Sequence, residues 1–149
     1  MDICAAEDTI IAPGETKLVQ TGLKMAIPEG YECQIRPRSG ISLNTPLRIP
    51  NAPGTIDSGY RDEVCVIMQN TSCPFYPGCD DEMFVMRNPS YNHYLISQKG
   101  NKPGWYDIKR GDRIAQIVFA KYEKVNTVQV ANVKDFGDDR GGGFGSTGI

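Results

Sequence analysis

Turn-forming dipeptides recur at short intervals along this chain and restrict its fold more than any other feature does. They separate short runs that are rich in β-branched and aromatic residues, which favour strands. The dipeptides are Pro13-Gly14, Glu29-Gly30, Pro53-Gly54, Pro77-Gly78 and Pro103-Gly104. The predicted strands cover residues 17–19, 23–27, 31–35, 64–68 and 114–120. Many short strands joined by such turns predict an all-β domain, either a sandwich, a jelly roll or a barrel.

Helical patterning is almost absent from the sequence. Only residues 40–44 favour a short helical turn, because no window keeps a 3.6-residue apolar period over three turns. The length of 149 residues fits one domain, since single domains commonly span roughly 100–200 residues. We therefore expect a single domain over residues 1–149.

Two segments interrupt the pattern of short strands. Residues 71–105 are dense in Pro, Asn, Gly, Asp and aromatic residues, and their one apolar run is 83–86. This composition predicts a long inserted excursion, and long loops are often functional. Residues 138–149 form a glycine-rich C-terminal arm that surrounds a single aromatic residue, Phe144. A core strand cannot be built from that composition.

Charge and hydropathy exclude several classes of function. Sixteen Lys and Arg residues against eighteen Asp and Glu residues leave a formal net charge of −2. This balance argues against binding to nucleic acid or to a membrane surface through bulk charge. No apolar run approaches the ~18 residues of a membrane span, and no charged-then-apolar leader opens the sequence. We therefore expect a soluble, unsecreted protein.

The cysteines predict a reducing compartment. Their number, five, is odd, and they show no paired CxxC spacing, whereas disulfide scaffolds of small secreted proteins normally have an even, dense set. Cys73 and Cys79 are close enough to suggest a metal site, but zinc usually takes four ligands and the sequence has one histidine, His93. Free thiols are the favoured interpretation.

Three consecutive residues, Arg38, Ser39 and Gly40, combine groups that bind phosphate. A guanidinium fork matches phosphate oxygens, and neighbouring backbone N–H groups form an anion-binding nest. A capped surface loop is the alternative interpretation of the same residues.

The segment 54–60 places a carboxylate, Asp57, three residues before an aromatic ring, Tyr60, between glycines that permit close approach of a ligand. Asp57 could orient a water molecule as a general base, and Tyr60 could stack on a sugar or base. The alternative is an Asx-turn followed by a core tyrosine.

Two further segments carry charged and polar groups. Residues 110–116 open an apolar strand with charges of both signs, for which a tight turn closed by an Asp–Arg pair is the alternative. The arm, from Arg140 to Gly148, combines a cation, backbone N–H groups, two hydroxyls and a ring. Such an arm could close over an anionic, planar ligand as a lid, or it could be a disordered glycine tail.

Together and in this order, these segments resemble the motifs of the trimeric dUTP pyrophosphatase (dUTPase) family. Residues 1–6 resemble the second half of the first family motif, and residues 37–42, 54–64, 110–118 and 140–148 resemble the second to fifth motifs. The resemblance covers the chain apart from the insertion at 71–105. It implies a jelly-roll-like β-barrel and hydrolysis of dUTP to dUMP and pyrophosphate, which limits uracil incorporation into DNA and supplies dUMP for thymidylate synthesis.

The resemblance also implies a role for each matching residue. Asp57 would activate the water that attacks the α-phosphorus, and Tyr60 would pack beneath the deoxyribose. Uracil would be read by Asn51 together with backbone groups of residues 52–56, which include Gly54, Thr55 and Ile56. Phosphates would be held by Arg38, Ser39, Gly40 and Gln116, and on the arm by Arg140, Gly145, Ser146 and Thr147, with Phe144 covering the uracil.

The resemblance further implies a cofactor, an assembly and a location. Mg²⁺ would be carried on the phosphates and linked through water to Asp2, with no dedicated protein cage. A homotrimer would share each active site between subunits, with the arm of one reaching another. The location would be cytoplasmic, or nuclear or organellar in a eukaryote.

The sequence departs from the family pattern at two places. Family members usually carry a strand and a glycine before the position of Met1. Either the start lies inside a longer reading frame, which we favour, or the protein folds without this edge strand. The insertion at 71–105 replaces a short turn, and its Cys73, Cys79, His93 and Trp105 are either solvent-exposed decoration or a contact for a partner.

Two alternative functions remain at this point. A dCTP deaminase shares the fold, but its catalytic glutamate would fall near Ile67, and isoleucine cannot relay protons. A binding or regulatory protein of the same fold, acting through the insertion, is the other alternative.

Overall fold

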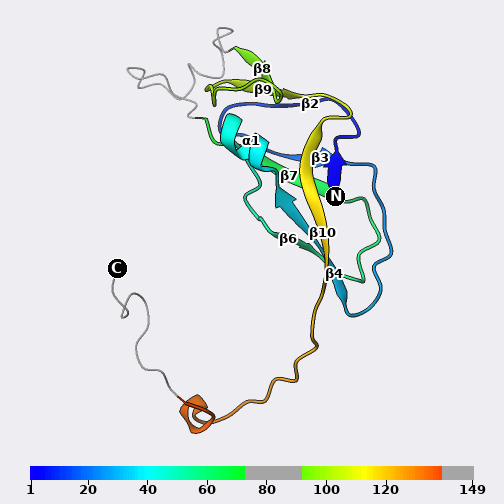
Figure 1. Cartoon of the computed structure of the whole chain (residues 1–149), viewed down its shortest axis with the longest axis vertical. Coiled ribbons are helices and arrows are strands. Elements are labelled where there is room, and N and C mark those ends of the chain that lie inside the picture. The colour runs from blue at the N-terminus through cyan, green and yellow to red at the C-terminus, as the bar shows by residue number, and fades with distance from the viewer. Residues whose placement is uncertain (73–91, 139–149) are drawn as a thin grey trace.

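The computed structural model describes residues 1–72 and 92–138, which are nearly all β-structure (Figure 1). The helical elements are α1 (Ser39–Asn44) and one 3₁₀ turn, η1 (Val133–Asp135). The strands are β1 (Asp2–Cys4), β2 (Thr9–Ile11), β3 (Thr16–Gln20), β4 (Tyr31–Pro37), β5 (Leu47–Arg48), β6 (Gly54–Ile56), β7 (Cys65–Asn70), β8 (His93–Leu95), β9 (Trp105–Ile108) and β10 (Arg113–Lys121). The all-β prediction and the short helix at 40–44 are confirmed. None of the helices in the described ranges is long and apolar enough to span a membrane.

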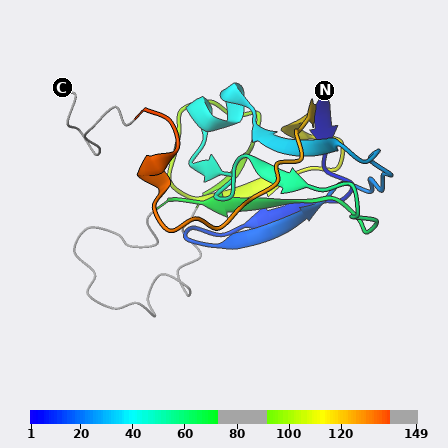
Figure 2. The same cartoon turned by 90° about the horizontal axis from the view of Figure 1, so that it is seen from below.

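The strands form three small sheets in stacked layers (Figure 2). The first sheet has the order β1-β10-β4-β6, the second β2-β9-β8 and the third β3-β7-β5. The pairing is antiparallel throughout, except that β8 and β9 run parallel. The first sheet is the one that positions the candidate site, because its strands carry residues from each predicted motif of the described chain.

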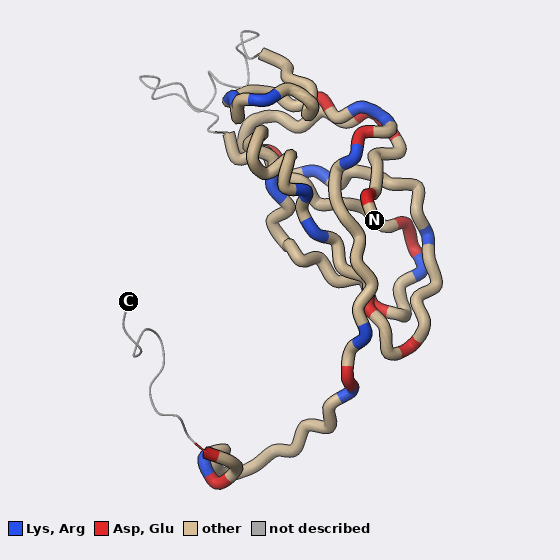
Figure 3. The backbone as a smooth tube through the Cα atoms, in the orientation of Figure 1, with Lys and Arg blue, Asp and Glu red and all other residues tan. Residues whose placement is uncertain are grey.

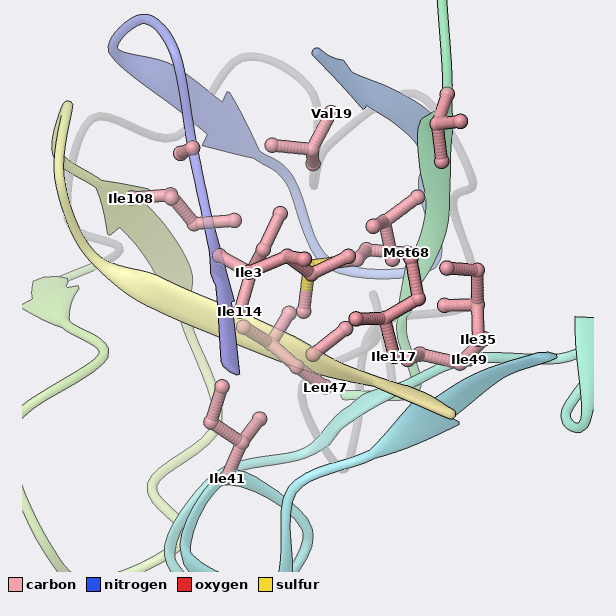
Figure 4. Packing of buried hydrophobic residues seen from close by; sticks show 14 of the residues in the cluster. Ile3, Val19, Ile35, Ile41, Leu47, Ile49, Met68, Ile108, Ile114 and Ile117 are labelled. Carbon is pink, nitrogen blue, oxygen red and sulfur yellow. The ribbon is translucent and has the colours of Figure 1, made fainter. Parts of the chain in front are cut away.

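A single apolar core lies between the sheets (Figure 4). Strand β7 alternates half-buried and fully buried positions, so Val66 and Met68 point inward, as a period of two requires. They join a cluster that includes Val19, Leu47 and Ile117. The predicted strands at 17–19, 31–35, 64–68 and 114–120 coincide with β3, β4, β7 and β10, so these four are confirmed.

The predicted strand at 23–27 is wrong, because this segment joins no sheet. Its burial still alternates, with Met25 half-buried and Ile27 buried. However, within residues 1–72 and 92–138 its one backbone hydrogen bond to another segment runs from Val64 N to Leu23 O, at 2.8 Å. Gly22 enters the segment at φ +70°, a conformation that interrupts an extended ladder.

The described ends of the insertion meet at one buried amide. The side chain of Asn70 is 0% exposed, and its Nδ2 donates to Ile11 O at 3.1 Å and to Gly104 O at 2.8 Å. Its Oδ1 accepts from Ser72 N at 3.0 Å. Asn70 therefore ties Ser72 and Gly104, which flank the segment, to the sheet. Residues 73–91, with Cys73, Cys79 and the run 83–86, lie outside the described part.

Residues from the C-terminal part of the insertion extend the second sheet. His93 stacks on Trp105 with ring centroids 5.5 Å apart, and His93 Nδ1 lies 2.7 Å from Asp107 Oδ1. Tyr94 and Ile96 pack against the core. These contacts join residues 92–105 to the main body.

After β10 the chain leaves the barrel (Figure 3). Residues 123–138 are exposed, and apolar side chains are among them. Val125 and Val128 are 78% and 79% exposed, and Phe136 is 69% exposed. Exposed apolar side chains gathered in this way are typical of interaction surfaces.

Candidate active site

A cavity of about 220 Å³ opens beside β4, β6 and β7. The predicted site residues among its walls are Asn51, Gly54, Thr55, Ile56, Asp57 and Tyr60. The structure therefore brings together the predicted general base, the predicted sugar-binding ring and the predicted base-reading residues. Sequence reasoning identified them on separate grounds, and they share one concave site.

Close backbone approach shapes one wall of this cavity. Gly54 begins β6 and pairs with Ile35 of β4. A Cβ atom at Gly54 would lie 2.9 Å from the Asn51 side-chain nitrogen, which is closer than real Cβ contacts permit. The glycine is thus required if the Asn51 amide is to lie in the wall of the cavity.

The Asp57 carboxylate is held through one of its two oxygens. Its Oδ1 accepts a hydrogen bond from Gly59 N at 2.7 Å, and its backbone oxygen accepts from Tyr60 N at 3.3 Å. The Asx-turn alternative is therefore confirmed. In the described chain, Oδ2 has no hydrogen-bond partner, so the turn orients the carboxylate and leaves one oxygen available to a water molecule.

Tyr60 is a wall residue and not a core residue. Its side chain is 39% exposed, and its hydroxyl donates to Glu63 O at 2.8 Å. The core-tyrosine alternative is therefore wrong. A ring held by its hydroxyl at the edge of a cavity presents one face to a ligand.

The remaining walls were missed by sequence reasoning. They are apolar or weakly polar: Ile35, Val64, Cys65 and Ile67. Only the two-residue spacing of Cys65 and Ile67 along one strand was available as a signal, and it does not say which face meets a ligand. Burial, and secondarily the charge of Glu63, raises the pKa of the Cys65 thiol. Ile67 makes this wall apolar where a deaminase would require its glutamate.

A second polar cluster gathers around Asp2, where β1 lies beside β10. Asp2 Oδ1 accepts from Arg38 Nε at 3.2 Å and from Gln116 Nε2 at 3.4 Å. Asp2 Oδ2 accepts from an Arg113 terminal nitrogen at 3.3 Å. Arg113, which was not predicted as a site residue, therefore belongs to this cluster together with the predicted Asp2, Arg38 and Gln116.

The electrostatics of this cluster favour an ionised carboxylate. Partial desolvation opposes ionisation of Asp2, but the hydrogen bond from Gln116 and the charges of Arg38 and Arg113 outweigh it. As a result, the pKa of Asp2 lies below its ordinary value. An ionised carboxylate can bind a hard cation such as Mg²⁺. The Asp2 carboxylate becomes available for this when the guanidinium groups of Arg38 and Arg113 turn away from it towards a bound anion.

The local backbone structure leaves the side chains of Arg38 and Arg113 available to bind Asp2. Helix α1 begins at Ser39, with Gly40 next, and Arg38 precedes it in extended conformation with no side-chain cap. The capped-loop alternative is therefore wrong. Asp112 closes a tight turn by accepting from Lys109 N at 2.8 Å, so the predicted turn is confirmed, but the Asp–Arg pair that was expected to close it is wrong. The ion pair that forms instead joins Arg113 to Asp2.

The cavity and the Asp2 cluster lie apart in this chain. In the first sheet, Ile56 pairs with Cys33, whereas Arg38 follows Pro37, at the other end of β4. Five residue steps of extended strand, from Cys33 to Arg38, separate those positions by about 16 Å. The cluster also lies over β1 and β10, on the side of β4 opposite to β6. One chain therefore holds two separate groups of predicted site residues.

The predicted arm residues Arg140, Phe144, Gly145, Ser146 and Thr147 lie outside the described residues. Across residues 1–72 and 92–138, no three His, Cys, Asp or Glu side chains gather as metal ligands. Among the described carboxylates, Asp2 is the one that is hydrogen-bonded to predicted phosphate-binding residues, Arg38 and Gln116.

Comparison with known proteins gives one consistent result. A family model described as dUTPase matches residues 1–76. The deoxyuridine 5'-triphosphate nucleotidohydrolase of Solibacter usitatus is 41% identical over 99% of this chain and 79% of its own length.

Solved structures give the same result. The dUTPase of Staphylococcus bacteriophage 80alpha with dUPNHPP is similar at a TM-score of 0.76 and 28% identity, over 99% of this chain and 85% of that one. A mutant of the dUTPase from phage phi11 of S. aureus, whose structure describes coordination of a structural Mg(II) ion, has a TM-score of 0.71 and 26% identity. That likeness covers 88% of this chain and 82% of the phage chain.

Proposed function

This chain belongs to the dUTPase family, and on that premise we propose that it hydrolyses dUTP to dUMP and pyrophosphate. The observation that carries the proposal is the cavity that brings Asn51, Asp57 and Tyr60 together. The solved 80alpha enzyme with dUPNHPP supports a nucleotide of this kind as the ligand.

In this proposal the cavity recognises the nucleoside. The Asn51 amide carries both a donor and an acceptor, so it can pair with the mixed edge of uracil. Backbone groups of Thr55 and Ile56 complete base recognition at the edge of β6. The Tyr60 ring packs beneath the deoxyribose and leaves no room for a 2′-hydroxyl.

Asp57 serves as the general base. Its free oxygen accepts a proton from a water molecule while the water oxygen attacks the α-phosphorus in line. The bond from the α-phosphorus to the bridging oxygen breaks, and pyrophosphate leaves with that oxygen. The hydrogen bond from Gly59 N to Asp57 Oδ1, at 2.7 Å, supports this role, because it fixes the orientation of the carboxylate while the other oxygen takes the proton.

The Asp2 cluster serves the triphosphate. The substrate carries about four negative charges, which repel a nucleophile unless they are neutralised. Arg38 and Gln116 turn from Asp2 to the phosphate oxygens, joined by Ser39 and Gly40. On the arm, Arg140, Gly145, Ser146 and Thr147 bind the terminal phosphate, and Phe144 covers the uracil.

The residues present fit a magnesium ion. Asp2 offers a partly exposed, ionised carboxylate, and Mg²⁺ usually binds through one or two carboxylates, water and substrate phosphates. Asp2 would hold the ion through water, and the ion would supply further neutralisation of phosphate charge. The Mg(II) ion of the phi11 enzyme supports this cofactor.

We further propose a homotrimer with shared active sites. The separation of the cavity from the Asp2 cluster along β4 supports it, because a nucleotide bound to one chain's cavity needs another chain's Arg38. The exposed apolar residues between Val125 and Phe136 support contact of this segment with a neighbouring subunit.

The cellular role follows from the reaction. Removing dUTP limits uracil incorporation into DNA, and the product dUMP is a precursor for thymidylate. We propose a cytoplasmic location, or a nuclear or organellar one in a eukaryote; the free thiols of Cys4, Cys33 and Cys65 suit a reducing compartment.

The test is pyrophosphate release with Mg²⁺ from dUTP, measured beside dCTP, dTTP and UTP. We expect selective turnover of dUTP. Equal turnover of all four nucleotides, or none by a folded trimer, would contradict the proposal.

A further inference from the structure

The loop that carries Asp57 and Tyr60, residues 57–63, is held mainly by bonds within itself. Gly59 N bonds to Asp57 Oδ1, and the Tyr60 hydroxyl bonds to Glu63 O. Arg61 donates to Ser58 O at 2.6 Å and to Tyr60 O at 2.8 Å. These bonds give the loop a defined shape, but they do not fix its position against the barrel.

One side chain supplies that fixation. Glu63 Oε1 accepts from Gly22 N at 2.8 Å and from Thr21 N at 3.1 Å. Among residues 1–72 and 92–138, no other side chain of the loop forms a hydrogen bond to a residue outside it. A carboxylate that accepts two backbone N–H groups makes charge-assisted bonds, which are the strong ones.

The segment that receives Glu63 is itself anchored next to the loop. Thr21 Oγ1 donates to Val64 O at 2.5 Å, and Val64 N donates to Leu23 O at 2.8 Å. Thus Leu23, the first residue of the segment 23–27 that was wrongly predicted as a strand, lies against the end of the loop. The N–H groups that bind Glu63 belong to Thr21 and Gly22, which come directly before that segment.

We propose that Glu63 is a positioning residue for deoxyribose selection: its carboxylate ties the loop 57–63 to Thr21 and Gly22 and so fixes the Tyr60 ring. This rests on the proposed dUTP hydrolysis. The Tyr60 ring is 39% exposed and its hydroxyl bonds to the backbone oxygen of Glu63. The position of that oxygen, and with it the ring, therefore depends on the anchor that the Glu63 side chain provides.

A displaced ring would affect two nucleotides differently. The ring is expected to exclude a 2′-hydroxyl by close packing, so a loose ring admits ribose more readily and packs less well on deoxyribose. Loss of the anchor therefore lowers the ratio of kcat/KM for dUTP to kcat/KM for UTP. A purely structural role would lower both values together and leave the ratio unchanged.

The experiment compares four proteins in pyrophosphate release from dUTP and UTP: wild type, Glu63→Ala, Glu63→Gln and Asp62→Ala. Asp62 is exposed and has no hydrogen-bond partner in the described chain, so its variant removes the same charge beside the anchor. We expect Glu63→Ala to reduce the dUTP/UTP ratio about tenfold, the size of one lost charge-assisted bond. Glu63→Gln keeps an acceptor oxygen but loses the charge, so its ratio should fall between those of wild type and Glu63→Ala, whereas Asp62→Ala should stay within about twofold of wild type.

Three results would overturn the proposal. An unchanged ratio in Glu63→Ala with selective wild-type turnover would remove the role of Glu63 and leave the proposed function intact. An equal fall of the ratio in Asp62→Ala would assign the effect to charge alone. Absence of wild-type turnover would contradict the function and the proposal together. If Glu63→Ala does not fold, Glu63→Asp, which keeps the charge but shortens the reach, takes its place with the same expected fall.

Discussion

Arg38 Nε lies 3.2 Å from Asp2 Oδ1, in an ion pair that joins the start of the chain to the residue after β4. The pair places a phosphate-binding cation against the carboxylate proposed to accept Mg²⁺ through water. Asp57 follows β6, which pairs with the middle of β4, at residues 33–35. The chemistry of the site is therefore divided between two regions that one chain keeps apart.

The division predicts complementation between two inactive variants. Asp57→Asn removes the base and Arg38→Ala removes the phosphate-binding cation, so each variant alone should lose at least about 100-fold in kcat/KM. In trimers assembled from equal amounts of both, about a quarter of the sites combine an intact Asp57 with an intact Arg38 from a neighbour. Co-expression with two affinity tags removes the homotrimers and leaves mixed trimers with one intact site of three, so a pyrophosphate assay should recover about a third of wild-type activity.

The matched control for Arg38 is Arg36. Its guanidinium bonds to Gln34 Oε1 at 2.7 Å and makes no contact with Asp2 in the described chain. Arg36→Ala should therefore keep most of the activity. If the mixed trimers are as inactive as the single variants, both groups of site residues act within one chain and the division described above has no functional meaning.

Asn70→Ala should be strongly destabilising. Three backbone groups, Ile11 O, Gly104 O and Ser72 N, would lose their partner in a fully buried position. Each unsatisfied group costs about 1–3 kcal/mol, so the free energy of unfolding should fall by about 3 kcal/mol or more. Chemical denaturation measures this change.

Asn44→Ala provides the comparison for Asn70. The Asn44 side chain donates to Gly40 O in an exposed position, so its loss should cost less than about 1 kcal/mol. Equal losses from the two variants would show that Asn70 does not hold the ends of the insertion.

Gly54→Ala should weaken substrate binding with little change in the fold. The added Cβ would lie 2.9 Å from Asn51 Nδ2 and must displace the base-reading amide. We expect KM for dUTP to rise about tenfold, with a smaller change in kcat.

A double-mutant cycle isolates the cause of the Gly54 effect. With Asn51→Ala in place, the contact is gone, so adding Gly54→Ala should have little further effect on KM. Additive effects of the two substitutions would exclude the contact with Asn51 as the cause.

The ion pair of Asp8 with Lys109 predicts a pH dependence of stability. The bond from Arg110 N, and then that from Lys109 Nζ, hold the pKa of Asp8 below 3.8, while Asp8 raises the pKa of Lys109 above 10.5. Stability from the depressed carboxyl pKa is complete above 3.8 and disappears as the pH falls through the folded-state pKa. Stability from the raised Lys109 pKa is complete below 10.5 and disappears as the pH rises through the folded-state value.

Asp8→Asn should therefore lower Tm by a constant amount between about pH 5 and pH 9. The difference from wild type should shrink only outside that window, which differential scanning fluorimetry can follow. A difference that already changes between pH 7 and pH 5 would contradict the assignment to Asp8.

Sequence patterns predicted the fold where apolar runs between turns coincided with pairing. The run 64–68 became β7, which pairs with β3 on one side and β5 on the other. The segment 23–27 is a similar run between turns but has no partner strand. A run of strand-forming residues reports local preference, and pairing depends on what the rest of the chain places beside the segment.

The site was predicted where function needs particular residue types. A carboxylate and a ring between glycines identified Asp57 and Tyr60. Arg113 was missed, because a guanidinium next to a turn is ordinary in any β-protein. The distance between Asp57 and Arg38 could not be predicted either, because it depends on the register of β6 against β4.

The most direct test of the account is pyrophosphate release from dUTP by wild type and by Asp57→Asn, measured on trimers of equal thermal stability. Asparagine retains the size of the side chain and an oxygen for the Gly59 N–H, but it cannot accept the proton of the attacking water. We predict selective dUTP turnover by wild type and a loss of at least about 100-fold in kcat, with dUMP affinity retained, in Asp57→Asn. Near wild-type turnover by Asp57→Asn would contradict the assignment of the base and of the cavity as the reaction site.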